Sequence, residues 1–453
     1  MTKNNTRVIS LLACLGFLFF SCATKSEAYR DIDYAVDRND FEEAIEAIKK
    51  GQEGSRPIYP EKNAISLYLD KGLLEHYAGN YANSSQDLQE AERLIEEAFT
   101  KSITADLASY ILNDNTKEYP GEDFEDIYIN VFNALNYYNR GNLEGAMVEI
   151  RKLTLSSGKL NMLERKYVNA NRSANDGMEN TLNDFGVSMN DALPQGGAVN
   201  YSNSALARYL SALFYLGDGD ADGFRIEMEQ LRAAFVSNRK IYYHSFPKSI
   251  ADVRTVPDGK TRLNVIGFTG LSPIKEEGTF YQYFPFFNNM TLHRPAFKLP
   301  MFVKRPSRID RIEVVIGMEK FNLELLEDMG AVIEETYNAR FAQIFLKTYI
   351  RTLLKYAAID IAATEAGRQA NSILVSEASA LAAKKAFDVT ESADIRMSRY
   401  LPDKAYIGGI NLEPGNYTVV AHYYSQGRII AREERDVNVR ANALNLIQMV
   451  CLR

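Results

Sequence analysis

The sequence predicts a multidomain α+β fold: helix pairs first, a mixed middle part with strands and a long helical region, and a small antiparallel β domain last. Three observations support this prediction. Apolar residues in the first half recur at helical spacing between short turns rich in glycine and asparagine. Proline and glycine interrupt that pattern near residue 245. Short runs of β-forming residues alternate with turn signals towards the end of the chain.

The first residues have the pattern of an export signal that is removed before Cys22. Lys3 and Arg7 form a basic start, residues 8–20 are almost wholly apolar, and the small Ser21 precedes the cysteine. A secretory signal has an apolar stretch of about 7–15 residues. A helix that spans a bilayer needs about 20 apolar residues, so a permanent transmembrane anchor is the weaker interpretation.

The segment LGFLFFSC, which ends at Cys22, resembles the lipobox of bacterial lipoproteins. It departs from the strict pattern, because Phe19 stands three residues before the cysteine, where the pattern has leucine, and Leu18 lies one step earlier. The rival segment LLAC is closer to that pattern, but it leaves too short an apolar stretch ahead of Cys14. The resemblance implies acylation of Cys22 and stable attachment to a membrane through two or more lipid chains.

An ordinary signal peptide cut nearby is the alternative to lipidation. By analogy with enteric sorting, Ala23 in place of aspartate after the cysteine favours the outer membrane. Once Cys14 is removed and Cys22 acylated, Cys451 is the remaining thiol, and it lies in an apolar stretch where we expect a buried side chain. No disulfide is then expected within the mature chain.

The length and the charge of the chain limit its class. At roughly 150 residues per domain, 453 residues suggest two to four domains. The formal net charge is −7, and no cluster of basic residues occurs in the sequence, which argues against a nucleic-acid partner.

The first half of the chain contains repeated helix pairs. The best example places Ala134, Tyr137, Gly141, Leu143 and Ala146 at the spacing of small residue, aromatic, turn glycine, apolar residue and alanine. This spacing resembles a tetratricopeptide (TPR) repeat. We therefore predict a TPR-like helical solenoid, with a generic bundle of antiparallel helices as the alternative.

Equivalent turns occur at Asn39 and Gly79, and residues 205–235 form a fourth unit. The turns are spaced more widely than the roughly 34 residues of regular repeats, so insertions such as the polar stretch 170–203 break the register. A solenoid of this kind offers a concave face to a peptide or protein.

The rest of the chain predicts strands and one long helical region. We expect strands near 262–275, 295–303 and 311–316, and helices over 323–387. The Ala-rich part, 357–386, favours close helix–helix contact, with a membrane-touching hairpin as the alternative. The L-x-P-G-x-Y-x-V pattern that starts at Leu412 resembles small Ig-like or transthyretin-like sandwiches. The expected limits are 1–21 for the signal, 22–240 for the helical repeats, 241–395 for the strands and helical hairpin, and 396–453 for the β domain.

Several stretches together resemble a family of uncharacterised bacterial lipoproteins with TPR-like repeats. These stretches are 119–125, 146–151, 270–275, 326–331, 351–355 and Leu401-Pro402. None of these motifs is specific by itself. The resemblance implies the same architecture, but no active site and no cofactor.

The sequence lacks the common catalytic motifs. The four histidines are widely scattered, and no GxSxG, Walker or dinucleotide-binding pattern occurs. Pairs of carboxylates such as Glu122 and Glu125 are expected to be solvated on a helix flank. No catalytic residue and no cofactor is therefore predicted.

One acidic stretch fits the EF-hand loop pattern. Asp218, Asp220, Asp222 and Glu229 stand at the positions that supply oxygen ligands to Ca²⁺. Arg225 occupies a position where EF-hands have an aliphatic residue. The same acidic residues are also typical of a helix N-terminus, so a helix cap is the alternative.

Two functions from different classes follow. The first is a lipid-anchored, non-catalytic interaction or scaffold protein of the cell envelope, whose helical repeats hold a protein or peptide partner. The alternative is a carbohydrate-binding accessory or enzyme of the envelope, with a candidate Ca²⁺ site in the loop 218–229. It is suggested by the sandwich-like strands at the end of the chain and by the aromatic stretch 280–287.

Overall fold

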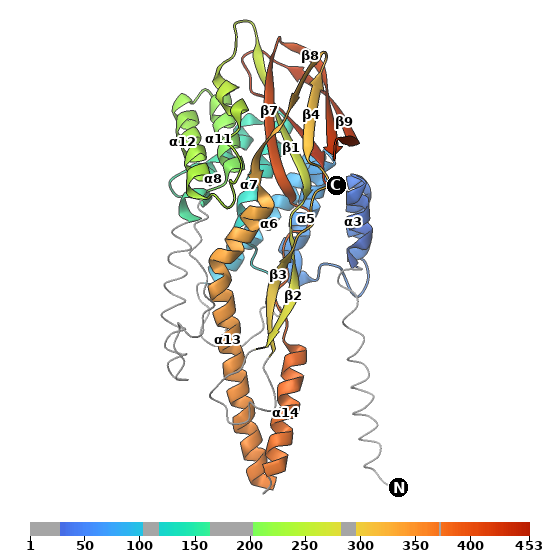
Figure 1. The fold of residues 1–453 in the computed structure, drawn as a ribbon, viewed down its shortest axis with the longest axis vertical. Helices are drawn as coiled ribbons and strands as arrows, with labels where there is room; N and C mark the ends of the chain where they lie inside the picture. Colours follow the sequence, from blue (N-terminus) through green and yellow to red (C-terminus); the bar gives the residue numbers. More distant parts are fainter. Residues whose placement is uncertain (1–27, 103–116, 164–202, 282–295, 371–372) are drawn as a thin grey trace.

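The computed structural model describes residues 28–102, 117–163, 203–281, 296–370 and 373–453. The predicted mixed α+β class is confirmed. A layer of helix pairs lies against two stacked β-sheets, and a long helical hairpin with a two-stranded ribbon projects from this body as a stalk (Figure 1).

Four helix pairs form the helical layer. The pairs are α3 (Arg30–Asp37) with α4 (Phe41–Gln52), α5 (Ala64–Tyr77) with α6 (Tyr81–Ser102), α7 (Asp123–Asn139) with α8 (Leu143–Thr154), and α11 (Ala205–Gly217) with α12 (Ala221–Ser237). Successive pairs pack on one another through α4 and α5, α6 and α7, and α8 and α11. Two short 3₁₀ helices, η2 (Glu61–Asn63) and η5 (Lys248–Arg254), precede α5 and the first strand.

The same turn joins the two helices of every pair. Asn39, Gly79, Gly141 and Gly219 all have positive φ, a conformation that glycine and asparagine adopt readily. The N–H of the next residue then donates to the carbonyl five residues before it, at 2.8–2.9 Å. This hydrogen bond satisfies one of the free carbonyls at the end of the first helix. The side chains of Asp40, Asn142 and Asp220 cap the second helix. The three turns predicted as equivalent, and the fourth unit, are confirmed as helical hairpins.

Two four-stranded sheets pack beside the helical layer. The inner sheet has the order β10-β1-β7-β6, and the outer sheet the order β5-β4-β8-β9. Their strands are β1 (Thr261–Leu271), β4 (Arg311–Ile316), β5 (Glu319–Asn322), β6 (Glu324–Asp328), β7 (Pro402–Leu412), β8 (Gly415–Ser425), β9 (Arg428–Val439) and β10 (Asn445–Cys451). All pairs are antiparallel except β1 with β10, which run parallel.

The expected β domain at 396–453 does not stand alone. Its strands β7 and β10 flank β1, and its strand β8 pairs with β4, so both sheets cross the boundary expected at residue 395. The predicted limit was wrong because a pattern along the chain reveals where a strand lies but not which distant strand it pairs with. The strands β5, β6 and β7 were also not predicted, and β6 occupies the expected start of the long helix.

The strand β1 is buried on both faces. Leu263 and Val265 point between the two sheets, where they belong to one apolar cluster with residues such as Val314 of β4. Ile266 and Phe268 point to the other side and join the core of the helical layer. The inner sheet therefore has helices on one face and the outer sheet on the other.

The stalk consists of α13 (Met329–Ala370), α14 (Ile373–Thr390) and the ribbon of β2 (Ile274–Tyr281) with β3 (Ala296–Val303) (Figure 1). Phe297 of the ribbon lies against Tyr349 of α13, with ring centroids 5.9 Å apart. Tyr356 donates a hydrogen bond to Asp388 across the two helices. The predicted helical hairpin is confirmed, although its first helix starts at Met329.

Because the helices and the inner sheet share one core, we expect them to unfold together. Phe268 is fully buried, and its ring lies 5.3 Å from that of Phe132 in α7. Phe268→Ala should lower the free energy of unfolding by about 3–5 kcal/mol. Two probes should report the same loss of free energy: urea unfolding followed by the circular dichroism of the helices, and amide exchange in β1.

The control is Phe280→Ala. Because Phe280 in the ribbon is 44% exposed, this change should lower the free energy of unfolding far less. A loss of protection confined to β1, with the helical transition unchanged, would show that helices and sheets are independent domains.

Candidate functional site

The first helix of each later pair is buried on almost every side. Helices α5, α7 and α11 lie between the outer helices and the inner sheet, and nearly all residues of α7 up to Asn136 are buried. Tyr138 at the end of α7 donates a hydrogen bond to the carbonyl of Leu444 and accepts one from the N–H of Leu446, at the start of β10. The inner sheet thus covers the face that a free solenoid would offer to a partner.

A buried carboxylate of the inner sheet accepts hydrogen bonds from the helices that face it. Glu327 of β6 is fully buried and accepts hydrogen bonds from the hydroxyls of Tyr128, Ser204 and Tyr242 at 2.8–2.9 Å. The N–H of Leu206 donates a fourth bond at 3.3 Å. Burial raises the pKa of Glu327, while these donors stabilise its charged form.

The rest of the inner face is covered by residues 391–401, here called the linker, which joins α14 to β7 without regular structure. Ser398 in the linker contacts two buried carboxylates at once. Its hydroxyl donates to Asp70 of α5 at 2.8 Å, and its N–H donates to Glu125 of α7 at 2.5 Å. Tyr77 donates to the carbonyl of Tyr400 at 2.9 Å. The linker therefore lies in the helical layer as an extended bound peptide would.

This arrangement changes the sequence-based expectation for the partner site. The concave face predicted to hold a peptide is filled by the inner sheet and by the linker of the same chain. The surfaces of the helical layer that remain exposed belong to the second helices of the pairs, α4, α6, α8 and α12, and to α3, where Tyr34 is 61% exposed.

The two carboxylates under the linker have perturbed pKa values. Burial raises the pKa of Asp70 to about 6, although Tyr59, Ser398 and the N–H of Arg399 all donate to it. Burial, with the nearby charge of Glu122, raises the pKa of Glu125 to about 7. The expectation that Glu122 and Glu125 are a solvated pair was wrong for Glu125, which is fully buried within a capping box.

The histidines do not converge on a site. His76 is buried between Asn136 of α7 and Gln448 of β10, and burial lowers its pKa to about 4. His244 and His422 lie elsewhere in the fold, and His293 lies outside the described residues. In the described ranges, no three His, Cys, Asp or Glu side chains come together as metal ligands.

The acidic stretch at 218–229 does not form an EF-hand loop. Helix α12 starts at Ala221, so the stretch is helical from there on and cannot wrap around an ion. Asp220 accepts from the N–H of Gly223 as a helix cap, and Arg225 pairs with Glu229 at 2.8 Å. The Ca²⁺ interpretation was wrong because helix caps and Ca²⁺ loops use the same residue types, and the helix-cap alternative describes this turn.

The other residues singled out in the sequence have separate places. Cys22 lies outside the described residues. Cys451 is buried as predicted, its Sγ accepts from Asn39 at 3.3 Å, and burial raises the pKa of its thiol. In the aromatic stretch, Phe280 and Tyr281 are exposed at the end of β2, and residues 282–287 lie outside the described residues.

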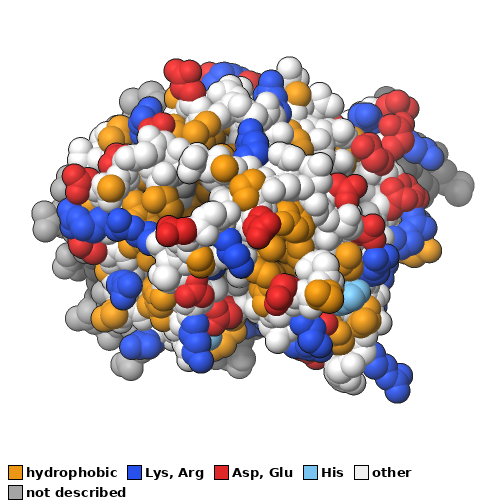
Figure 2. All heavy atoms as spheres, turned by 90° about the horizontal axis from the view of Figure 1, so that it is seen from above, with side chains coloured by type: hydrophobic (Ala, Val, Ile, Leu, Met, Phe, Trp, Pro, Cys, Tyr) orange, Lys and Arg blue, Asp and Glu red, His pale blue; other side chains and the backbone are white. Residues whose placement is uncertain are grey.

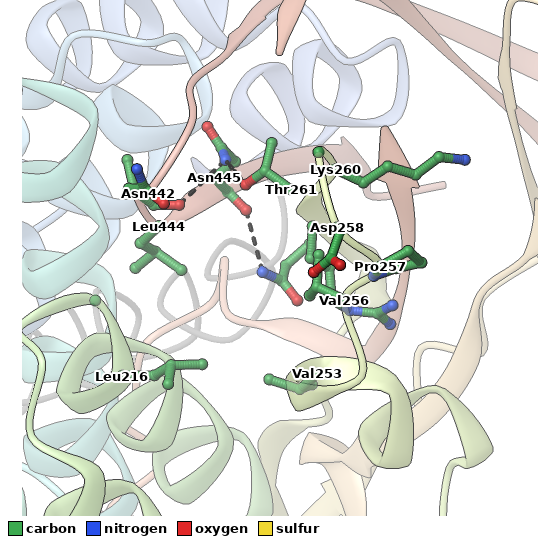
Figure 3. A pocket seen from close by; sticks show the side chains of 15 residues that line it. Leu216, Val253, Val256, Pro257, Asp258, Lys260, Thr261, Asn442, Leu444 and Asn445 are labelled. Atoms are coloured by element: carbon green, nitrogen blue, oxygen red, sulfur yellow. Dashed lines mark hydrogen bonds between the residues drawn. The ribbon is translucent and has the colours of Figure 1, made fainter. Parts of the chain in front are cut away.

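A pocket of about 520 Å³ opens at the end of the body away from the stalk, where β1 and β10 begin. Leu216, Val253 and Leu444 form apolar walls around its open centre, while Asn445 and Thr261 lie opposite (Figure 3). The molecular surface at this end carries acidic and basic side chains side by side with apolar ones (Figure 2). A continuous basic stripe, as nucleic-acid binding requires, is not seen on this face.

No family model, no curated protein and no solved structure matches this chain. Among the described helices, none is long and apolar enough to cross a membrane.

Sequence reasoning missed both the linker contacts and the pocket. Asp70 and Ser398 lie far apart in the chain, and neither belongs to a recognisable motif. Arg262 and Asn264, which line the pocket floor, stand within a strand pattern that by itself predicts alternate exposure rather than a site.

The raised pKa of Asp70 predicts a pH-dependent stability. A carboxyl group whose pKa is raised on folding binds its proton more tightly in the folded state, so its contribution is lost as pH rises through the folded value. Between about pH 4 and pH 7, the free energy of unfolding of wild type should fall by on the order of 3 kcal/mol relative to that of Asp70→Asn, which cannot ionise. Urea unfolding of both proteins across this range measures the difference.

The comparison with the variant is needed because His76 acts in the opposite sense. Its lowered pKa makes the folded state less stable as pH falls below about 6.5. His76 is present in both proteins, so it cancels in the difference. Curves that stay parallel from pH 4 to pH 7 would contradict the role assigned to Asp70.

Proposed function

We propose that this protein is a lipid-anchored protein of the bacterial cell envelope that acts as a non-catalytic interaction or scaffold module built on TPR-like helical hairpins. The observation that carries the proposal is the repetition of one hairpin, with the same turn at Asn39, Gly79, Gly141 and Gly219. Stacked hairpins of this type are typical of proteins that bind other proteins. The anchor would be an acylated Cys22, and Ala23 favours the outer membrane.

The partner surface is the outer side of the helical layer, since the inner side is filled by the chain itself. Large apolar side chains are exposed there, among them Val148 on α8 and Ile226 and Val236 on α12, which are 45–71% exposed. Both helices pack against α11, and apolar side chains that gather on one surface are common at protein-binding sites. A partner would therefore lie across the second helices of the pairs.

The alternative, a carbohydrate-binding accessory or enzyme of the envelope, has one observation in its favour. Phe280 and Tyr281 expose their rings at the end of β2, and aromatic rings stack on sugars. A glycan array probed with the full chain separates the two proposals, since a scaffold gives no specific hit.

The anchor is tested by metabolic labelling with a radioactive fatty acid. Wild type should carry the label and sediment with membranes. Cys22→Ala should lose the label, because the acceptor thiol is gone. Cys14→Ala is the matched control and should keep it, since that cysteine leaves with the signal. Label retained in Cys22→Ala but lost in Cys14→Ala would move the anchor to the rival segment.

The interaction surface is tested by photo-crosslinking in cells. A photoreactive amino acid at Val148 or Ile226 should give the same protein adduct, because both positions lie on outer helices. The control position is Met318, which is fully exposed in the turn between β4 and β5 on the outer sheet. No adduct from the helices, together with activity on a cell-wall glycan, would refute the scaffold proposal.

A further inference from the structure

The pocket at the start of β1 and β10 has a polar floor that the described part of the chain leaves partly unsatisfied. Arg262 and Asn264, both on the face of β1 that points to the helices, line it, and they are 7% and 4% exposed. Each has one buried polar atom without a hydrogen-bond partner among the described residues: Nε of Arg262 and Oδ1 of Asn264. Buried polar atoms without partners are rare in folded proteins and call for an explanation.

The guanidinium of Arg262 is a buried positive charge without an ion-paired carboxylate. Its Nη2 donates to the carbonyl of Ser249 at 3.0 Å, and among the described residues no ion pair joins it to an acidic side chain. Burial lowers the pKa of Arg262, and Tyr209 and then Asp252 offset this only in part. An arginine stays charged in proteins, so the site favours an anion.

Asn264 requires a different kind of group. Its Nδ2 donates to the carbonyl of Asn445 at 3.2 Å, which fixes the amide and leaves Oδ1 as a free acceptor. Only a hydrogen-bond donor can satisfy this atom. The floor therefore calls for one acceptor and one donor, presented to two side chains that stand two residues apart on the same face of β1.

The strand opposite leaves room for the arginine. Gly409 of β7 is paired with Asn264, and a side chain at this glycine would come within 3.0 Å of the Arg262 guanidinium and 2.7 Å of the Leu263 carbonyl. The absence of a side chain at Gly409 thus lets the guanidinium lie across the sheet at the pocket floor.

We propose that this pocket binds a small carboxylate with a hydroxyl or amino group on the adjacent carbon. The carboxylate accepts from Arg262, and the neighbouring hydroxyl or ammonium donates to Asn264. Leu216, Val253 and Leu444 form an apolar wall for the remainder of the ligand (Figure 3). The volume of about 520 Å³ lies within the range of roughly 300–1,000 Å³ found for small-molecule sites.

Ordered water is the competing explanation for the two unsatisfied atoms. A water molecule can accept from Nε and donate to Oδ1, but it brings no charge to the guanidinium. The two explanations differ in one measurable respect: only the ligand proposal requires discrimination between an anion and its neutral amide.

The test uses wild-type protein and four defined probes in calorimetric titrations. Lactate and alanine carry both the carboxylate and the adjacent donor, and they distinguish hydroxy acids from amino acids as the source. Propionate lacks the donor, and lactamide lacks the charge. At least one of lactate and alanine should bind, and propionate and lactamide should each bind about tenfold more weakly or worse.

Two variants assign the binding to the floor. Arg262→Gln should remove the preference of the pocket for the better ligand of lactate and alanine over lactamide. Asn264→Leu should remove its preference for that ligand over propionate. Lys260→Gln is the matched control, because Lys260 is an exposed cation on the rim and should keep both preferences. Circular dichroism checks that each variant is folded, and the probe series on wild type stands even where a variant is not.

Three results would overturn the proposal. One is the absence of binding by lactate and alanine up to about 10 mM, which would favour water alone. Another is binding of lactamide as tight as that of the better ligand of lactate and alanine, which would show that the charge of Arg262 plays no part. The third is an unchanged preference in a folded Arg262→Gln variant, which would place the ligand elsewhere.

Discussion

The arrangement of the body depends on the burial of the Glu327 carboxylate. A buried ionised carboxylate is costly unless hydrogen bonds compensate it, and Glu327 receives four of them from α7, from the start of α11 and from Tyr242. The donors belong to α7, to the start of α11 and to the segment after α12 that contains Tyr242, whereas the acceptor belongs to the inner sheet. The relative position of helices and sheet is therefore fixed by a group that tolerates little displacement.

The same principle governs the linker. Asp70 and Glu125 lie beneath it, and Ser398 supplies donors to both through its hydroxyl and its N–H. The segment that covers this part of the helical layer is therefore supplied by the chain itself. The helical layer is thus a scaffold for its own sheet on one side and an exposed surface on the other.

Local features of the fold were predictable because neighbouring residues determine them. The turns at Asn39, Gly79 and Gly141 follow from the need for positive φ at a helix end, and the helical hairpin of the stalk follows from its long apolar periodicity. Pairing over long distances was not predictable. Nothing near Leu263 indicates that it lies beside Asn445, and nothing near Asp220 separates a helix cap from a Ca²⁺ ligand. The pocket residues were not predicted for the same reason. Only the folded chain shows that Nε of Arg262 and Oδ1 of Asn264 lack hydrogen-bond partners among the described residues.

The parallel pairing of β1 with β10 has a kinetic consequence. Helices α5 and α7 are synthesised early, yet His76 has its second hydrogen-bond partner in Gln448 of β10, and Tyr138 bonds to Leu444 and Leu446. Contacts between segments so far apart in sequence form slowly, because a long loop must close before they are made. The helical layer cannot complete its core until β10 has emerged from the ribosome. Until that strand arrives, the faces of α5 and α7 that the inner sheet covers remain exposed to solvent.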